Sequence, residues 1–179
     1  GCFLVFDFGG GTLDVSVVDY FDNVIEIIAV SGDNHLGGDD FDESIARYFC
    51  NMHEISYEGL KAGERASLLQ FAEKCKRDLS SLKEVTGTFE LCGEKKMTLD
   101  NVRLAKLGQD LFDRMALVIT RVLNDSGRTI EELDEIILVG GSSRMPAVGF
   151  FLQTVFGKNP HMAASPDEIV AMGAGIYAG

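Results

Sequence analysis

The sequence predicts an α/β fold in which a mixed sheet is flanked by helices. Three strand-length apolar runs fill the first 31 residues, and a fourth such run returns at 135–139. Apolar residues at helical spacing occupy most of the chain between them. Apolar residues make up 46% of the 179, so the chain is long enough and apolar enough to bury a core.

The first three elements are predicted to form an antiparallel meander. Residues 2–8 are almost all apolar and end at three consecutive glycines, as a buried strand with a turn would. Residues 12–20 alternate between apolar and polar from Leu13 onward, which indicates a half-buried strand. A third strand is expected at 23–31.

Helical spacing begins next. The stripe of Phe41, Ile45, Phe49 and Met52 predicts a helix over 39–54. A second helix is expected at 64–82 and a small β hairpin at 83–98. A single long helical region should then run from Leu104 to Gly127.

The C-terminal third is expected to contain one more strand and three helices. Thr129 and Glu132 have the spacing of a capping box, which opens a short helix. A buried strand follows at 135–139, and a helix comes after it. A second capping box, with Pro at the first helical position, opens a last helix at Ser165.

These elements divide into two parts. Residues 1–54 and 100–179 are expected to form an inner subdomain, and residues 55–99 an outer subdomain inserted in it. The chain starts directly inside a predicted strand without an initiator Met, so we expect it to be a piece cut from a longer protein.

The charge balance excludes some partners. The 16 basic residues face 28 acidic ones, for a formal net charge of −12, so we expect no nucleic-acid partner. No apolar run reaches the length of about eighteen residues that spans a bilayer, so we expect no membrane partner. A phosphate site in so acidic a chain would need local backbone N–H groups and a metal ion.

The four cysteines are scattered and none forms a C-x-x-C pair, which is typical of buried free thiols in a reducing compartment. We therefore expect a cytoplasmic protein.

The segment Asp7-Phe8-Gly9-Gly10-Gly11-Thr12 carries the strongest chemical signal. Consecutive glycines can adopt positive φ and aim several N–H groups at one point, which suits a phosphate group. Asp7 and Asp14 flank the loop as candidate partners of magnesium or of its water shell. The alternative is a plain hairpin turn, although such a turn usually needs only one or two glycines.

Two further glycine pairs adjoin helix starts. Gly140 and Gly141 join the buried strand at 135–139 to a helix, where sheets of this kind bind ligands, but a tight turn with a serine cap fits equally. Gly37 and Gly38 open another helix. Their N–H groups could meet a phosphate, or the acidic residues that follow could simply suit the helix dipole.

One face of the helix predicted at 64–82 is polar. Glu73, Lys76, Arg77 and Ser80 recur at helical spacing, which alone indicates a solvated face.

Five segments, taken in their order and separation, closely resemble the second lobe of the ATPase domain of DnaK-type heat-shock chaperones. They are DFGGGTLDVS, GDNHLGGDDFD, EKCKRDLSS, LVGGSSRMPAV and SPDEIVAMGA. The resemblance covers essentially all 179 residues. It implies the actin-like ATPase fold, which is ribonuclease H-like, with ATP or ADP and Mg²⁺ as cofactors.

The resemblance also implies roles for matching residues. Asp7 and Thr12 would be catalytic, and Asp7 and Asp14 would hold the metal ion through water. The predicted nucleotide contacts are Gly9, Gly10, Gly11, Asp14, Gly37, Gly38, Glu73, Lys76, Arg77, Ser80, Gly140, Gly141, Ser142, Arg144 and Asp167. Among them, Arg77 and Arg144 would lie on the two faces of the adenine.

The resemblance implies a function shared with parts that this chain lacks. The first lobe of the ATPase domain and a peptide-binding domain are missing, so the isolated chain is expected to be inactive. The whole protein would couple ATP hydrolysis to binding and release of unfolded client peptides, with co-chaperones. The segment 54–66 is shorter than in relatives, which leaves a nucleotide-exchange factor in doubt. The alternatives are a small-molecule kinase of the same superfamily and a non-enzymatic actin-like filament scaffold.

Overall fold

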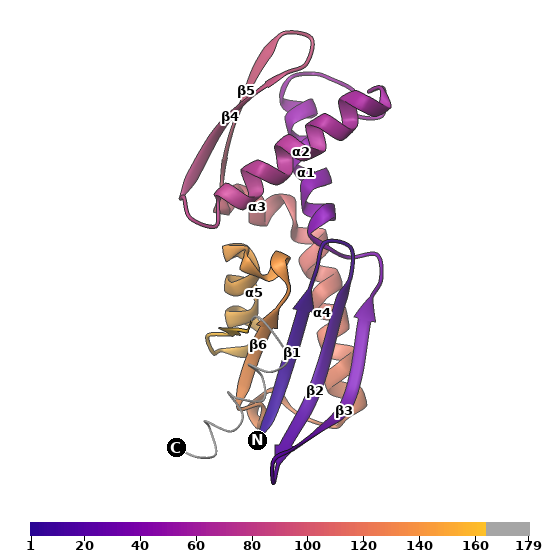
Figure 1. The fold of residues 1–179 in the computed structure, drawn as a ribbon, viewed down its shortest axis with the longest axis vertical. Coiled ribbons are helices and arrows are strands. Elements are labelled where there is room, and N and C mark those ends of the chain that lie inside the picture. The colour runs from indigo at the N-terminus through magenta and orange to yellow at the C-terminus, as the bar shows by residue number, and fades with distance from the viewer. Residues whose placement is uncertain (164–179) are drawn as a thin grey trace.

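The computed structural model describes residues 1–163 and contains the predicted mixed sheet. The five strands lie in the order β3-β2-β1-β6-β7 (Figure 1). Strands β1, β2 and β3 pair antiparallel, whereas β6 pairs parallel with β1 and with β7. The strands span Cys2–Phe8 (β1), Leu13–Phe21 (β2), Val24–Asp33 (β3), Glu135–Val139 (β6) and His161–Met162 (β7).

The meander is confirmed, and a tight turn explains it. Asp22 and Asn23 connect β2 to β3 with φ values of 50° and 62°. Two consecutive residues with positive φ twist a hairpin in the same sense as its strands, and Asp and Asn tolerate that conformation. The short strand β7 has no counterpart in the prediction, because two residues carry no periodicity.

Helices cover the sheet and extend beyond it. Figure 1 shows α4 running along β1, β2 and β3, while α5 lies beside β6 and α1 rises from the upper end of the sheet. Above them, α2 packs with the β4–β5 hairpin. The helices span Gly38–Met52 (α1), Ala62–Asp78 (α2), Asn101–Leu107 (α3), Gln109–Ser126 (α4) and Pro146–Phe156 (α5). The hairpin strands are Glu84–Glu90 (β4) and Glu94–Asp100 (β5), and 3-10 turns occur at Ile130–Glu132 (η1) and Gly141–Arg144 (η2).

The long helical region predicted from Leu104 to Gly127 is present, but it is not one continuous helix. The chain forms two helices, α3 and α4, that are separated at Gly108. A Cβ atom at Gly108 would lie 2.3 Å from the Phe41 ring, so the break lies where this side chain of α1 packs against the backbone. Periodicity did not reveal it, because the apolar spacing continues across the break.

Helix α2 also ends earlier than predicted, at Asp78. Leu79 forms its C-cap, and Ser80 and Ser81 continue in a turn, with the Ser80 N–H donating to the Arg77 carbonyl. Ser80 therefore lies just past the helix. The capping box at Thr129 is present, but it opens only the 3-10 turn η1.

A continuous core joins the sheet to the upper elements. It runs from Leu4 and Phe6 of β1 through Phe41 and Phe49 of α1 to Met97 of β5. Two residues at the margins of the core differ from the prediction. Met52, predicted on the apolar stripe of α1, is 42% exposed, and Cys92, predicted as a buried thiol, lies on the surface at the β4–β5 turn. Cys2, Cys50 and Cys75 are buried free thiols, as predicted. Within residues 1–163, no helix combines the length and the apolar character needed to cross a membrane.

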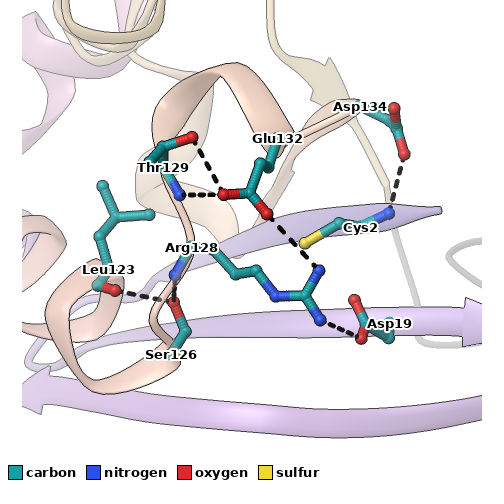
Figure 2. Close-up of polar contacts among 8 residues, drawn as sticks. All are labelled: Cys2, Asp19, Leu123, Ser126, Arg128, Thr129, Glu132 and Asp134. Carbon is teal, nitrogen blue, oxygen red and sulfur yellow. Dashed lines mark hydrogen bonds and ion pairs between the residues drawn. The ribbon is translucent and has the colours of Figure 1, made fainter.

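Polar contacts tie the start of β1 to the α4–β6 connection (Figure 2). The Arg128 guanidinium lies 2.7 Å from Asp19 of β2 and 3.9 Å from Glu132. The Cys2 N–H donates to the Asp134 carboxylate at 2.8 Å. Burial, followed by the Asp19 carboxylate, raises the pKa of the Cys2 thiol to about 11, so this thiol stays protonated at neutral pH.

Candidate functional site

A cavity of about 480 Å³ lies where three separate segments meet. The loop between β1 and β2 contributes Gly10, α2 with the turn after it contributes one wall, and η2 contributes the other. The lining residues are Gly10, Asp39, Glu73, Lys76, Arg77, Ser80, Gly141, Ser142, Arg144 and Met145. The structure thus brings together eight of the residues that the sequence predicted as nucleotide contacts, from segments that span more than 130 residues of the chain.

The glycine loop presents free N–H groups. The Gly9 N–H donates to the Thr12 carbonyl at 3.0 Å and closes the turn. In the described part of the chain, the N–H groups of Gly10, Gly11 and Thr12 have no acceptor, and all three residues are exposed. Unpaired donors from adjacent residues are the kind of group that binds a phosphate.

The predicted backbone conformation of this loop is wrong, however. None of the three glycines adopts φ in the left-handed region. Nor does close packing within this chain require glycine at Gly10 or Gly11. A Cβ atom at Gly10 would make only an ordinary contact with the Asp39 carboxylate, at 3.5 Å, and a Cβ at Gly11 would meet nothing within 4 Å, so both face open space beside the cavity.

Helix α1 begins directly against this loop. Its first N–H groups, from Gly38 and Asp39, donate to the carbonyls of Gly9 and Gly10 at 2.9 Å each. The Gly37 N–H donates to the Asp40 carboxylate at 2.8 Å. Of the two alternatives for this segment, N–H groups left exposed for a phosphate are not found here, because each already has an acceptor in the protein.

Glycine is nonetheless required at two positions around the loop. A Cβ atom at Gly37 would lie 2.2 Å from the Gly10 carbonyl oxygen, closer than any non-bonded contact. Gly140 has φ of +95°, and its Cβ would lie 2.4 Å from the Phe8 carbonyl oxygen. The three glycine segments therefore pack backbone against backbone, which explains their joint occurrence in the sequence.

Two carboxylates face each other beside the loop. Asp7 of β1 is the register partner of Asp14 of β2, so both side chains point to the same face of the sheet. Burial, followed by repulsion from Asp14, raises the pKa of Asp7. Within residues 1–163, no three side chains of the metal-ligating types form a cluster. Two carboxylates could hold a hard cation only with water or phosphate oxygens completing its shell.

The α2 wall carries both exposed and buried charge. Arg77 is 75% exposed and lies 2.6 Å from the Glu73 carboxylate. Lys76 differs, because only 8% of its side chain is exposed. Its ammonium group lies 2.7 Å from Asp42 and donates to the Gly38 carbonyl at 2.9 Å.

Sequence reasoning missed Asp42. It is 5% exposed and pairs with Lys76 in the wall of the cavity. A signal was available, since Asp42 precedes Ile45 by three residues and Phe49 by seven, and so interrupts the buried face of α1. A charge on such a face needs a partner, and the partner is a predicted site residue.

The opposite wall is formed by η2. Ser142 and Arg144 point to the cavity from this turn, which the buried Ser143 anchors by donating to the Val139 carbonyl at 2.7 Å. Arg144 is exposed and forms no ion pair with another described residue, so its guanidinium is available to a ligand. The prediction for Asp167 lies outside the described residues.

Comparisons with known proteins agree with this architecture. The family model described as Hsp70 protein matches residues 2–179. A chaperone protein dnaK from Gracilaria tenuistipitata var. liui is 39% identical over 188 aligned residues, which cover 98% of this chain and 30% of the relative. The chloroplastic stromal 70 kDa heat shock-related proteins of Pisum sativum and Spinacia oleracea are each 40% identical over 187 residues. Those alignments cover 98% of this chain, and 26% and 31% of the two relatives.

The chain therefore spans less than a third of the length of these relatives. The match to the family model over nearly its whole length nevertheless assigns it: the chain belongs to the Hsp70 family, and its mixed sheet with flanking helices is an α/β lobe of the actin-like ATPase fold.

Proposed function

We propose that this chain is the second lobe of a chaperone ATPase domain and supplies one side of the nucleotide-binding cleft. The observation that carries the proposal is the cavity between α2 and η2, which opens beside the free N–H groups of the glycine loop. A cavity of about 480 Å³ is in the size range of small-molecule sites. Its two ends offer different chemistry, as a nucleotide requires.

The adenosine end would lie between Arg77 and Arg144. Both guanidinium groups line the cavity from opposite walls, and a planar guanidinium stacks well on an aromatic base. Glu73 and Ser80 line the α2 wall, where a carboxylate and a hydroxyl suit the hydroxyl groups of a ribose.

The phosphates would lie over the glycine loop. Gly10, Gly11 and Thr12 offer N–H donors there, and Gly9 belongs to the same turn. Gly37, Gly38 and Gly140 would act by allowing close approach, because their own backbones pack against the loop. Gly141 and Ser142 continue the same surface on the η2 side.

Asp7 and Asp14 fit a Mg²⁺ ion held through water. Their positions on one face of the sheet and the raised pKa of Asp7 indicate two carboxylates that repel each other without a cation. A bound Mg²⁺ neutralises phosphate charge during phosphoryl transfer. Asp7 would orient the water that attacks, while the Thr12 hydroxyl would hold the terminal phosphate beside it.

In the whole protein, this half-cleft would face a first lobe that this chain does not include. We propose that the complete enzyme couples ATP hydrolysis to binding and release of unfolded peptides, and that co-chaperones regulate the cycle. Family membership favours this activity over a small-molecule kinase or a filament scaffold. The compartment stays a prediction: free thiols suit the cytoplasm, and equally the chloroplast stroma for which the pea and spinach relatives are named.

The cavity can be tested by filling it. A Cβ atom at Gly141 meets nothing within 4 Å, so Gly141→Leu should extend into the cavity without disturbing the fold. We expect calorimetry on the full-length protein to show that this variant no longer binds ADP. Gly149→Leu is the matched control, because Gly149 is equally unobstructed but lies in α5 outside the cavity. Unchanged ADP binding by Gly141→Leu would place the nucleotide elsewhere.

A further inference from the structure

Lys76 and Asp42 form a buried ion pair at the base of the cavity. Only 8% and 7% of their side chains are exposed, and their charged atoms are 2.7 Å apart. Taking two charges out of water is costly, and replacing such a pair by apolar residues is often neutral or stabilising. Stability alone therefore does not explain why the pair is present.

The surroundings of Lys76 indicate what the pair does. A Cβ atom at Gly38 would lie 2.3 Å from the Ser142 hydroxyl oxygen and 3.1 Å from the Lys76 nitrogen. The absence of a side chain at Gly38 therefore lets α1, α2 and η2 converge on one point. Ser142 and Lys76 both line the cavity there, while Asp42 lies behind Lys76 and lines none of it.

The hydrogen-bond capacity of Lys76 is only partly used. An ammonium group has three N–H donors. Within the described residues, the ammonium donates a hydrogen bond to the Gly38 carbonyl and forms an ion pair with Asp42. Donor capacity therefore remains for a ligand in the cavity.

We propose that Asp42 is a positioning residue for nucleotide binding: its ion pair holds the Lys76 ammonium where a remaining N–H donor reaches the nucleotide. The proposal rests on the proposed function and adds to it a residue that does not touch the ligand. The pair also joins α1 to α2.

A double-mutant cycle on the full-length protein tests this assignment with ADP as the probe. We expect Asp42→Asn to weaken ADP binding about tenfold, the effect of losing one hydrogen bond from a charged group. In a Lys76→Met background, the same Asp42→Asn change should have no effect on ADP affinity, because Asp42 acts only through Lys76. Equal losses in both backgrounds, or no loss in either, would overturn the proposal.

A control variant separates this role from a general loss of charge on α1. Glu43→Gln makes the same charge change on the exposed side of α1 and should leave ADP affinity unchanged. A loss of ADP affinity in Glu43→Gln equal to that in Asp42→Asn would contradict the assignment.

A measurement on the unmodified protein covers the case in which Asp42→Asn does not fold. In protein labelled with ¹⁵N-lysine, the Lys76 ammonium signal, assigned by its loss in Lys76→Met, should shift when ADP saturates the site. An unchanged signal at saturation would reject contact between Lys76 and the nucleotide.

If the wild-type protein binds no ADP at all, the proposed function fails together with this inference. If it binds ADP and Gly141→Leu abolishes binding while the cycle shows no coupling, only this inference fails.

Discussion

Asp7 of β1 lies directly opposite Asp14 of β2, and the pair stands at the end of the hairpin that carries the glycine loop. Like charges directly opposite one another on an antiparallel pair are destabilising. The fold tolerates this arrangement in a position where a cation and phosphates are proposed to bind. The repulsion between the two carboxylates therefore gives a measurable test of the proposed ion site.

Removing one of these charges should stabilise the metal-free protein. We expect Asp7→Asn to raise the melting temperature in EDTA, because the repulsion from Asp14 is lost. The same variant should lose the additional stabilisation that Mg²⁺ gives the wild type in the presence of ADP. Thermal unfolding with and without Mg²⁺ measures both effects. Asp22→Asn at the β2–β3 turn removes an equivalent exposed charge and should change neither response.

The proposed stacking of guanidinium groups on the adenine can be probed through Arg144. In the full-length protein, Arg144→Ala should weaken ADP binding by about 1–2 kcal/mol, the range of a cation–π contact that is partly shielded from water. Calorimetric titration measures this directly. Arg121→Ala, an exposed arginine of α4 away from the cavity, should bind as the wild type does. Unchanged affinity in Arg144→Ala would remove Arg144 from the site.

Substitutions of a glycine in the loop and of a glycine packed against it should have opposite effects. Gly10→Val should abolish ATP turnover in the full-length protein but leave the fold largely intact, because its Cβ would only touch the Asp39 side chain at 3.5 Å while its methyl groups occupy the phosphate position. Gly37→Ala should instead destabilise the protein, because its Cβ would meet backbone atoms at 2.2–2.5 Å. Phosphate release and melting curves separate the two outcomes. Normal turnover by Gly10→Val would reduce the loop to a hairpin turn.

The isolated chain should fold but not hydrolyse ATP. Its core is continuous from β1 to β5, so cooperative unfolding is expected without the rest of the protein. Hydrolysis requires preorganised donors on all sides of the transferred phosphoryl group, and this chain supplies one side of the cleft. A phosphate-release assay beside the full-length protein, with a melting curve for folding, tests the expectation. Turnover by the folded chain at the full-length rate would contradict the half-cleft.

Acid should weaken the link between α4 and the turn that precedes α1. Burial opposes ionisation of Asp33, but the His35 N–H and the Arg114 guanidinium, at 2.8 Å, outweigh it and hold the pKa of Asp33 below its ordinary value. Because the pKa is lower in the folded chain, the stabilisation is complete above the unfolded value of about 3.9 and is lost as pH falls through the folded value.

We expect Arg114→Met to lower the free energy of unfolding by about 0.5–1 kcal/mol at pH 7, since the pair is partly exposed. That difference should shrink as pH falls below about 4. Urea unfolding at several pH values measures it, with Arg121→Met on the same helix as the control. A difference that stays constant across this range would show that Arg114 acts through packing instead of charge.

The sequence predicted most of the fold because its elements have clear periodicity. Alternation from Leu13 onward and the stripe of Phe41, Ile45 and Phe49 were sufficient for the meander and for α1. The break at Gly108 was not predictable from spacing, because its cause is the Phe41 ring from a distant segment. The end of helix α2 at Asp78 was likewise not predictable, because no Gly or Pro marks it.

The candidate site was predictable as a set of residues but not as a geometry. The motifs nominated both walls of the cavity, because the glycine pairs and the polar face of α2 are local patterns. They could not show that the N–H groups of Gly38 and Asp39 are used by the loop, since that depends on a backbone contact between segments almost thirty residues apart. The same limit concealed Asp42, whose significance appears only when its partner on α2 is known.

Helix α1 has its first N–H groups bonded to the glycine loop, and near its other end Phe49 packs against Phe71 of α2 and Phe89 of β4. A helix of 15 residues is a rigid rod about 22 Å long. A tilt at the end that contacts the glycine loop would therefore move the opposite end over a larger distance. A tilt of about 10° would displace the far end by about 4 Å, so a small adjustment at the proposed phosphate site would become a larger movement of the upper hairpin.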